Sequence, residues 1–140
     1  MIYQIAYTSA ASRTITDDDF KSILASARRN NPREGLTGML TFAGGSFLQV
    51  LEGEKEAVEH RYALIRADQR HMAAMKLVSH MVPERGFPDW SMGWYDCPAE
   101  HPMHALVKKI GSAKEMTEIA LQQSAPVQSL MNIFVKHRFA

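Results

Sequence analysis

Residues 36–51, Leu-Thr-Gly-Met-Leu-Thr-Phe-Ala-Gly-Gly-Ser-Phe-Leu-Gln-Val-Leu, decide the fold. Two short apolar runs, residues 36–42 and 46–51, flank a turn that contains Gly44 and Gly45. Because glycine adopts the positive φ angles of tight turns without steric cost, this pattern predicts a β-hairpin. The second run is apolar at both alternating positions, which is typical of a strand covered on both faces. We therefore expect the hairpin to supply a central strand of a sheet.

The segment before the hairpin predicts one strand and one helix. Residues 2–8 are rich in β-branched and aromatic side chains and end in a polar cluster, as strands do. An apolar period of three to four residues then predicts a helix from Thr16, where Thr16 and Asp19 have the spacing of a capping box. Residues 30–32, Asn-Asn-Pro, are expected to end this helix.

The segment after the hairpin completes a recognisable order of elements. It predicts a second helix marked by Val58, Tyr62 and Ile65 and ending near Asp68, a strand over residues 75–82, and a last strand holding Trp90, Met92 and Trp94. The resulting βαββαββ order contains the split βαβ arrangement of ferredoxin-like α+β folds. Such a fold places two helices on one face of the sheet.

The chain beyond Asp96 has a helical apolar pattern throughout. Its two apolar stripes are Met103, Leu106, Val107 and Ile110, followed by Val127, Leu130, Met131 and Phe134. The second face of the sheet would otherwise be exposed, so covering it is the simplest use of these helices. We expect a domain over residues 1–96 and a helical extension over residues 97–140 that packs on the sheet.

Composition narrows the class of protein. A chain of 140 residues with 46% hydrophobic residues can bury one core. The net charge is +1 and basic residues are scattered, so neither a nucleic-acid surface nor a polybasic membrane patch is expected. Cys97 is the only cysteine, and no apolar run approaches the ~20 residues that span a bilayer. With no leader pattern at the N-terminus, a cytoplasmic location is expected.

Gln49 is the most unusual residue, because it lies inside the apolar run 46–51. Burying an amide without partners costs roughly 1–3 kcal/mol, so Gln49 must face either a protein hydrogen-bond network or the polar edge of a ligand. Tyr7, near the end of the first strand, is either an ordinary half-buried aromatic or a functional phenol. Neither residue identifies a function by itself.

Other candidate residues leave the same choice open. The pair Asn30 and Asn31 is either a helix stop or a source of ligand-facing carboxamides. Arg70, followed by a histidine, is either part of a solvated turn or a contact for a phosphate or carbonyl oxygen. Trp90 and Met92 share one strand face, which suits both core packing and the lining of a flat heteroaromatic ring.

Metal and common nucleotide sites are not expected. His101 and His104 are three residues apart, but no acidic or thiol partner lies near them in the sequence. No GxGxxG sequence, P-loop or catalytic-triad pattern occurs. A ferredoxin-like architecture hosts many unrelated activities, so individual residues have to decide the function.

A set of short motifs, spread over residues 1–96, carries a family resemblance. They are Tyr7 in the first strand, Asn30-Asn31, Gly35-Leu36-Thr37-Gly38, residues 44–53 (Gly-Gly-Ser-Phe-Leu-Gln-Val-Leu-Glu-Gly), Arg70-His71, and residues 87–92 (Phe-Pro-Asp-Trp-Ser-Met). Together they resemble BLUF domains, the blue-light sensors that use FAD, and the chain resembles the short, single-domain members of that family. Some members carry histidine where this chain has Asn30.

The resemblance implies a flavin site and a mechanism. FAD would lie between the two sheet-covering helices, with Ile23 and Ile65 against the ring, Asn31 at its polar edge and Arg70 at its carbonyl side. Asn30 and Asp68 would give supporting contacts. The resemblance also implies a photoactive group made of Tyr7 and Gln49, with Trp90 and Met92 as residues that relay the change. Gln49 would accept from Tyr7 and donate to the flavin, which satisfies all three groups.

The resemblance further implies a signalling protein and not an enzyme. A downstream protein partner, not specified by the sequence, and a possible homo-oligomer are expected. Two rivals of the same fold are a nonphotochemical ligand-binding regulatory module and an acylphosphatase-like hydrolase. Arg13 and Asn31 are nominal catalytic candidates for the hydrolase, although the phosphate-cradling loop pattern of such enzymes is absent.

Overall fold

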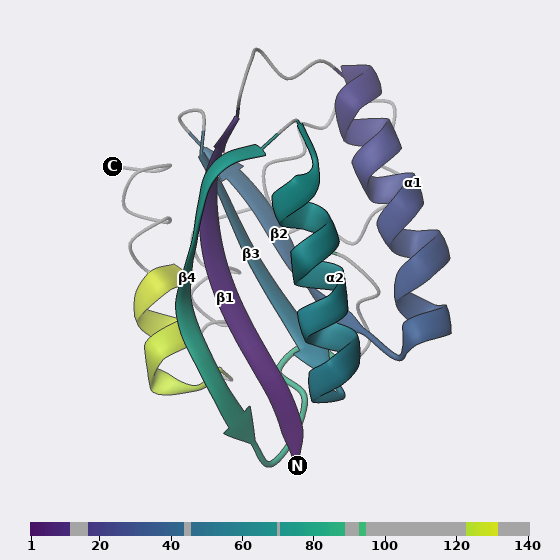
Figure 1. Ribbon diagram of the computed structural model, residues 1–140. Coiled ribbons are helices and arrows are strands. Elements are labelled where there is room, and N and C mark those ends of the chain that lie inside the picture. The colour runs from purple at the N-terminus through teal and green to yellow at the C-terminus, as the bar shows by residue number, and fades with distance from the viewer. Residues whose placement is uncertain (12–16, 44–45, 70, 89–92, 95–122, 132–140) are drawn as a thin grey trace.

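The computed structural model describes residues 1–11, 17–43, 46–69, 71–88, 93–94 and 123–131 (Figure 1). Its elements are β1 (Ile2–Ala11), α1 (Asp17–Glu34), β2 (Thr37–Ala43), β3 (Ser46–Gly53), α2 (Lys55–Ala67), β4 (His71–Val82) and β5 (Gly93–Trp94). The predicted βαββαββ order is confirmed.

The strands form one sheet in the order β4-β1-β3-β2-β5. The pairs β1–β4, β1–β3 and β2–β3 are antiparallel, whereas β5 runs parallel to β2, with Met39 beside Gly93 and Leu40 beside Trp94. This is the predicted ferredoxin-like α+β fold with an added edge strand. The predicted last strand also included Trp90 and Met92, which lie outside the described residues.

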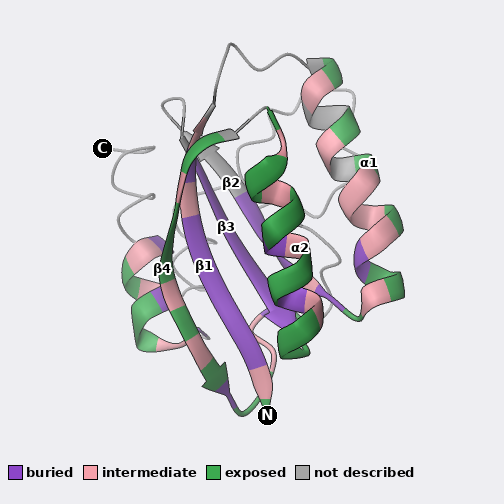
Figure 2. Cartoon of the chain, viewed as in Figure 1, coloured by how far each residue is buried: buried purple, intermediate pink, exposed green. Residues whose placement is uncertain are grey.

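Helices α1 and α2 cover one face of the sheet (Figure 1). The core on that face consists of Tyr3, Ile5, Tyr7, Leu36, Leu40, Phe47, Leu51, Val58 and Tyr62, with Ile23, Ala27, Ala57 and Ile65 packed against it. Figure 2 shows that the inner strands β1 and β3 are buried along most of their length, while β4 and the outer side of α2 are exposed. The prediction of a central strand in the second half of the hairpin is therefore confirmed.

The opposite face of the sheet has a second core, to which the C-terminal part of the chain contributes. Ala6, Met39 and Val50 from the sheet pack there with Val127 and Met131 from the helical residues 125–131. Of the second predicted stripe, Val127, Leu130 and Met131 pack on this face, and Phe134 lies outside the described residues. The first predicted stripe, around residues 103–110, lies outside the described residues, and a domain boundary near residue 96 stays a prediction.

The predicted end of α1 at residues 30–32 is wrong, because the helix continues through Pro32 to Glu34. Gly35 ends it with a φ of +68°, a conformation that glycine adopts without steric cost. The Gly35 N–H donates to the Pro32 carbonyl at 3.3 Å, and the Leu36 N–H donates to the Asn31 carbonyl at 2.8 Å. These two bonds form a Schellman motif, which satisfies carbonyls at the end of the helix.

Two strands are longer than predicted. β1 extends to Ala11 and β4 begins at His71, because pairing between these strands continues past irregular positions. The register of β1 on β4 shifts between Ala6 and Tyr7 and again between Thr8 and Ala10. Such bulges interrupt the alternation of apolar residues, which is why the sequence pattern placed the start of β4 too late.

A buried polar cluster connects β3 to the C-terminal segment on the second face. The fully buried Glu52 accepts hydrogen bonds from Gln4, Thr37 and the backbone N–H groups of Gly86 and Phe87. The Gln4 side-chain oxygen in turn accepts a 3.2 Å bond from the Ser124 hydroxyl. Strand β3 is thus tied to residues 123–131 through polar contacts as well as through the apolar core.

Within the part of the chain that the structure describes, no helix is both long and apolar enough to cross a membrane.

Candidate functional site

Tyr7 and Gln49 meet at the centre of the sheet. They are cross-strand partners on β1 and β3, and the Tyr7 hydroxyl donates a hydrogen bond to Oε1 of Gln49. Tyr7 is 0% exposed and Gln49 is 6% exposed, so water does not compete for this bond. The Tyr7 ring also packs on the Tyr62 ring of α2, with 5.0 Å between ring centroids. The Gln49 amide oxygen thus has a protein partner in the interior of the sheet.

Burial controls the protonation of both tyrosines. Removal from water raises the pKa of the Tyr7 phenol far above its ordinary value, and the nearby Tyr62 and Asp68 raise it further. Burial also raises the pKa of Tyr62, against an opposing effect of Arg66. Tyr7 is therefore a neutral phenol at any physiological pH, and its proton is available for donation to Gln49.

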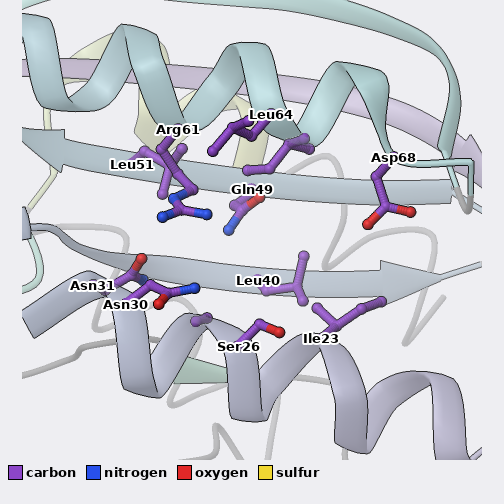
Figure 3. Close-up of a pocket in the computed structure, with 12 residues that line it drawn as sticks. Ile23, Ser26, Asn30, Asn31, Leu40, Gln49, Leu51, Arg61, Leu64 and Asp68 are labelled. Carbon is purple, nitrogen blue, oxygen red and sulfur yellow. The ribbon is translucent and has the colours of Figure 1, made fainter.

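A cavity lies next to this pair, between α1 and α2 and above the sheet (Figure 3). Its lining residues are Ile23, Ser26, Ala27, Asn30, Asn31, Leu40, Gln49, Leu51, Arg61, Leu64, Ile65 and Asp68. Its volume is about 210 Å³, which exceeds the roughly 150 Å³ of an engineered cavity that takes a benzene ring. Half of the lining residues are apolar and half carry polar or charged groups, a mixture that suits an amphipathic small molecule.

The lining follows from the periodicity of each element. Residues 23, 26, 27 and 30 share one face of α1, and residues 61, 64, 65 and 68 share one face of α2 or its C-cap. Gln49 and Leu51 are two positions apart on β3 and so face the same side. Figure 3 shows the Gln49 amide nitrogen directed into the cavity.

Six of the seven predicted cofactor contacts line this one cavity: Ile23, Asn30, Asn31, Gln49, Ile65 and Asp68. Asn30 reaches it because α1 continues past residue 32, which keeps the side chain on the same helical face as Ile23. The seventh, Arg70, lies outside the described residues, as do Trp90 and Met92. Arg13, named for the hydrolase alternative, lies outside them too.

The other six lining residues were not predicted from the sequence: Ser26, Ala27, Leu40, Leu51, Arg61 and Leu64. The signal for Arg61 and Leu64 was present, because both follow the helical spacing that leads to Ile65 and Asp68. For Leu40 the signal was the hairpin register, which pairs it with Gln49. Among the described residues, no group of three His, Cys, Asp or Glu side chains is arranged to hold a metal ion; His101 and His104 are not among those residues.

The cavity fits a flavin in its chemical character. A flavin ring is flat, with an apolar end and a polar edge of carbonyl and N–H groups. The cavity offers Ile23 and Ile65 from opposite helices for the faces of such a ring, and the amides of Asn30, Asn31 and Gln49 for its polar edge. These are the residue types that an amphipathic heteroaromatic ring requires.

Comparison with known proteins decides the family. The profile described as "BLUF: Sensors of blue-light using FAD" matches residues 2–93. The chain belongs to the BLUF family. BLUF domains are blue-light sensor modules that use FAD as their cofactor.

Several BLUF proteins are similar to this chain. The photoactivated adenylate cyclase subunit beta of Euglena gracilis is 37% identical over 91 residues, which are 63% of this chain and 10% of that protein. The blue light- and temperature-regulated antirepressor BluF of Escherichia coli K12 is 34% identical over 86 residues, 59% of this chain and 21% of that protein. This chain therefore spans a small part of these curated relatives.

A solved BLUF structure covers nearly the whole chain. The dark-state structure of BlrB is similar with a TM-score of 0.66 and 27% sequence identity, over 98% of this chain and 92% of that one. This similarity supports the expected likeness to short members of the BLUF family and the ferredoxin-like α+β assignment.

Proposed function

We propose that this chain is a blue-light photoreceptor that binds FAD noncovalently between α1 and α2 and signals through the hydrogen bonds of Tyr7 and Gln49. The observation that carries the proposal is the buried bond from Tyr7 to Gln49 at the wall of the cavity. One member of the pair lines the cavity and the other lies behind it. A change at the ligand is thus one hydrogen bond away from the interior of the sheet.

The proposed contacts follow the lining of the cavity. Ile23 and Ile65 would pack against the flavin ring, and Asn31 would bind its polar edge, with Asn30 and Asp68 in support. Gln49 would donate from its amide nitrogen while its oxygen accepts from Tyr7. Arg70 is proposed as a further contact on the basis of the BLUF resemblance.

The proposed chemistry at Tyr7 follows from its phenol group and from its hydrogen bond to Gln49. A bound flavin that has absorbed blue light is a strong oxidant. Tyr7 is an oxidisable phenol, and loss of an electron makes a phenol strongly acidic, so its proton can pass along the existing bond to Oε1 of Gln49. Return of the electron and proton would leave the Gln49 amide rotated or tautomerised. The hydrogen bonds on both sides of Gln49 would then differ from those of the dark form.

The proposed cycle turns over no substrate, so we propose a sensor and not an enzyme. Output would come from contacts with another chain or an effector domain. Residues 123–131 are a suitable relay, because they pack on Val50, the residue after Gln49, and are tied to Glu52 through Gln4. A cytoplasmic location completes the proposal, since a single cysteine suits a reducing compartment.

The first experiment is the purification of the chain and a visible absorption spectrum before and after blue illumination. The proposal expects a yellow protein that releases FAD when it is denatured, and an absorption spectrum with a small, reversible red shift after illumination. A colourless protein, also after incubation with FAD, would contradict it and favour a nonphotochemical module. Hydrolysis of an acyl phosphate by the colourless protein would favour the hydrolase alternative.

Removal of the residues after Asp96 tests the output. The proposal expects the truncated chain to keep its spectrum and lose light-dependent association or change its dark recovery. If the truncated chain shows the same light-dependent association as the full chain, the C-terminal segment is not the output element. Aggregation of the truncated chain would mean that the segment only covers the sheet.

A further inference from the structure

Arg61 places a cationic group at one end of the cavity. It comes from α2, and with Asn30 and Asn31 of α1 it lines the same end (Figure 3). Ile23 and Asp68 lie at the other end. The donors and acceptors of two carboxamides and the donors of a guanidinium thus gather at the same end of the cavity.

Glu34 holds Arg61 in place from the opposite helix. Nε of Arg61 donates to Oε2 of Glu34 at 3.2 Å, and Nη2 donates to Oε1. Two parallel bonds of this kind fix both the position and the plane of a guanidinium. The two side chains are 18% and 26% exposed, so the pair is partly shielded from water. A guanidinium carries further N–H donors besides these two.

We propose that Arg61 is a recognition residue for the polar edge of the flavin ring and that Glu34 is its positioning residue. This inference rests on the proposed function. The guanidinium already stands beside the carboxamides at the cavity wall, so it can donate to a ring carbonyl with little loss of side-chain entropy. The ion pair with Glu34 already orders the Arg61 side chain before the flavin binds.

The ring edge is a better ligand for this site than the phosphates of FAD. The ion pair with Glu34 is formally neutral, and the carboxylate would repel a nearby diphosphate. A neutral carbonyl oxygen suffers no such repulsion. The neighbouring side chains, Asn30 and Asn31, match the carbonyl and N–H groups of a flavin ring and carry no positive charge for a phosphate.

Arg61 lines the cavity and Glu34 does not, so the positive end of the ion pair faces the ring, and this has a second consequence. Charge near the ring nitrogens tunes the electronics of a flavin. Positive charge favours the form of the ring that has gained an electron, so Arg61 should raise the reduction potential of the bound flavin. This effect does not depend on light, and it separates a ring contact from a merely structural ion pair.

The test compares Arg61→Gln, Glu34→Gln and the matched control Arg66→Gln in the full chain. Arg66 lies on the same helix with its guanidinium 5.7 Å from the Tyr62 ring, and it does not line the cavity. Dissociation constants are measured for FAD and for riboflavin, which has no phosphate, and reduction potentials are measured for the bound flavins. Thermal unfolding without flavin gives the stability of each variant.

The proposal expects Arg61→Gln to weaken FAD and riboflavin equally, by about tenfold or more, as expected for a lost bond to a charged group. It expects a lower reduction potential of the bound flavin in Arg61→Gln. The loss of flavin affinity in Glu34→Gln should be smaller than in Arg61→Gln, and Arg66→Gln should change neither the affinity nor the potential. If Arg61→Gln does not fold, Arg61→Lys replaces it. The lysine keeps the charge but not the paired donors, so its loss of affinity for FAD and riboflavin should be larger than that of Arg66→Gln and smaller than tenfold.

Two outcomes would overturn the inference. If Arg61→Gln binds FAD more weakly but binds riboflavin as tightly as the unmodified chain does, Arg61 contacts a phosphate and not the ring. Equal changes in thermal stability for Arg61→Gln and Glu34→Gln, with flavin affinity and reduction potential unchanged, would make the pair a structural link between helices. Both outcomes leave the proposed function intact, whereas failure of the unmodified chain to bind any flavin would remove the proposed function itself.

Discussion

The Tyr7 hydroxyl donates a hydrogen bond to the Gln49 side-chain oxygen, and the two residues are direct cross-strand partners on β1 and β3. Gln49 is next to Leu40 on its other side, and both line the cavity. Tyr7 does not line the cavity. Gln49 therefore connects the phenol to whatever occupies the space between the helices.

Replacement of Tyr7 by phenylalanine separates packing from chemistry. The ring keeps its contact with Tyr62, so Tyr7→Phe should bind flavin with an affinity within a few fold of the unmodified chain. The variant lacks the hydroxyl and the oxidisable phenol, so illumination should give no red shift. Visible spectra before and after illumination check this, and a normal red shift in Tyr7→Phe would exclude Tyr7 from the photochemistry.

Replacement of Gln49 by leucine should leave flavin bound without a reversible shift, because an apolar side chain cannot exchange hydrogen bonds. The Tyr7 hydroxyl would also lose its acceptor in a buried position, at a cost of about 1–3 kcal/mol in the free energy of unfolding. The double variant with Tyr7→Phe should recover part of that cost. Chemical denaturation of both single variants and the double variant measures this double-mutant cycle. Strictly additive changes in the free energy of unfolding would argue against the bond between Tyr7 and Gln49.

The raised pKa of Tyr7 predicts a loss of stability at alkaline pH. An unfolded chain releases the phenol proton near the ordinary pKa of 10.0, whereas the folded chain retains it. The folded state then binds more protons, so the free energy of unfolding falls above about pH 10, by at most about 1.4 kcal/mol per pH unit. Tyr7→Phe lacks this contribution, while Tyr62 remains in both proteins. If the denaturation midpoint falls equally steeply with pH above about pH 10 in both proteins, the pKa of Tyr7 is not raised by folding.

Gly38 and Gly35 should respond differently to alanine. A Cβ atom on Gly38 would lie 1.9 Å from the Val50 carbonyl oxygen, so the backbone of β2 and β3 would have to separate. Gly35 has open space for a Cβ, and its φ of +68° costs an alanine about 1–2 kcal/mol. We expect Gly38→Ala to lower the free energy of unfolding by about 3 kcal/mol or more. A smaller loss for Gly38→Ala than for Gly35→Ala would show that the hairpin tolerates the contact.

Glu52→Gln tests the polar cluster on the second face. Both carboxyl oxygens accept two hydrogen bonds, and an amide nitrogen in place of one oxygen cannot accept any. Each donor that loses its acceptor should cost about 1–3 kcal/mol. Faster amide hydrogen exchange in residues 123–131 should accompany the loss, with an unchanged flavin spectrum in the dark. Unchanged exchange in that segment would mean that Gln4 and Ser124 do not tie it to β3.

The strand and helix order could be predicted because the pattern of residues 36–51 is strong and local. The end of α1 could not, because Asn-Asn-Pro is a common stop. Pro32 removes one helical N–H bond and crowds the preceding turn, yet the helix continues past it. Gly35 supplies the left-handed residue, and the N–H groups of Gly35 and Leu36 make the two bonds that close the helix. The late start predicted for β4 has a similar cause, since a bulge breaks the alternation on which the prediction depends.

The family motifs led us to expect the contact between Tyr7 and Gln49, which the structure contains, but not the contacts that only tertiary structure creates. Arg61 is an ordinary charged residue of an amphipathic helix by its sequence. Only the approach of α1 to α2 places it beside Glu34 and at the wall of the cavity. Helical spacing marks the face of α2 that carries Arg61, but no local pattern brings that face opposite Glu34, so the ion pair could not be predicted from the sequence.

The light-minus-dark absorption spectrum of the full chain with bound flavin, recorded beside Tyr7→Phe and Gln49→Leu, tests the central claim most directly. The unmodified chain should show a small red shift that reverses in the dark, and both variants should bind flavin and show no shift. An unmodified chain that binds flavin without any reversible shift, or a full shift that persists in both variants, would contradict the assignment of light sensing to Tyr7 and Gln49.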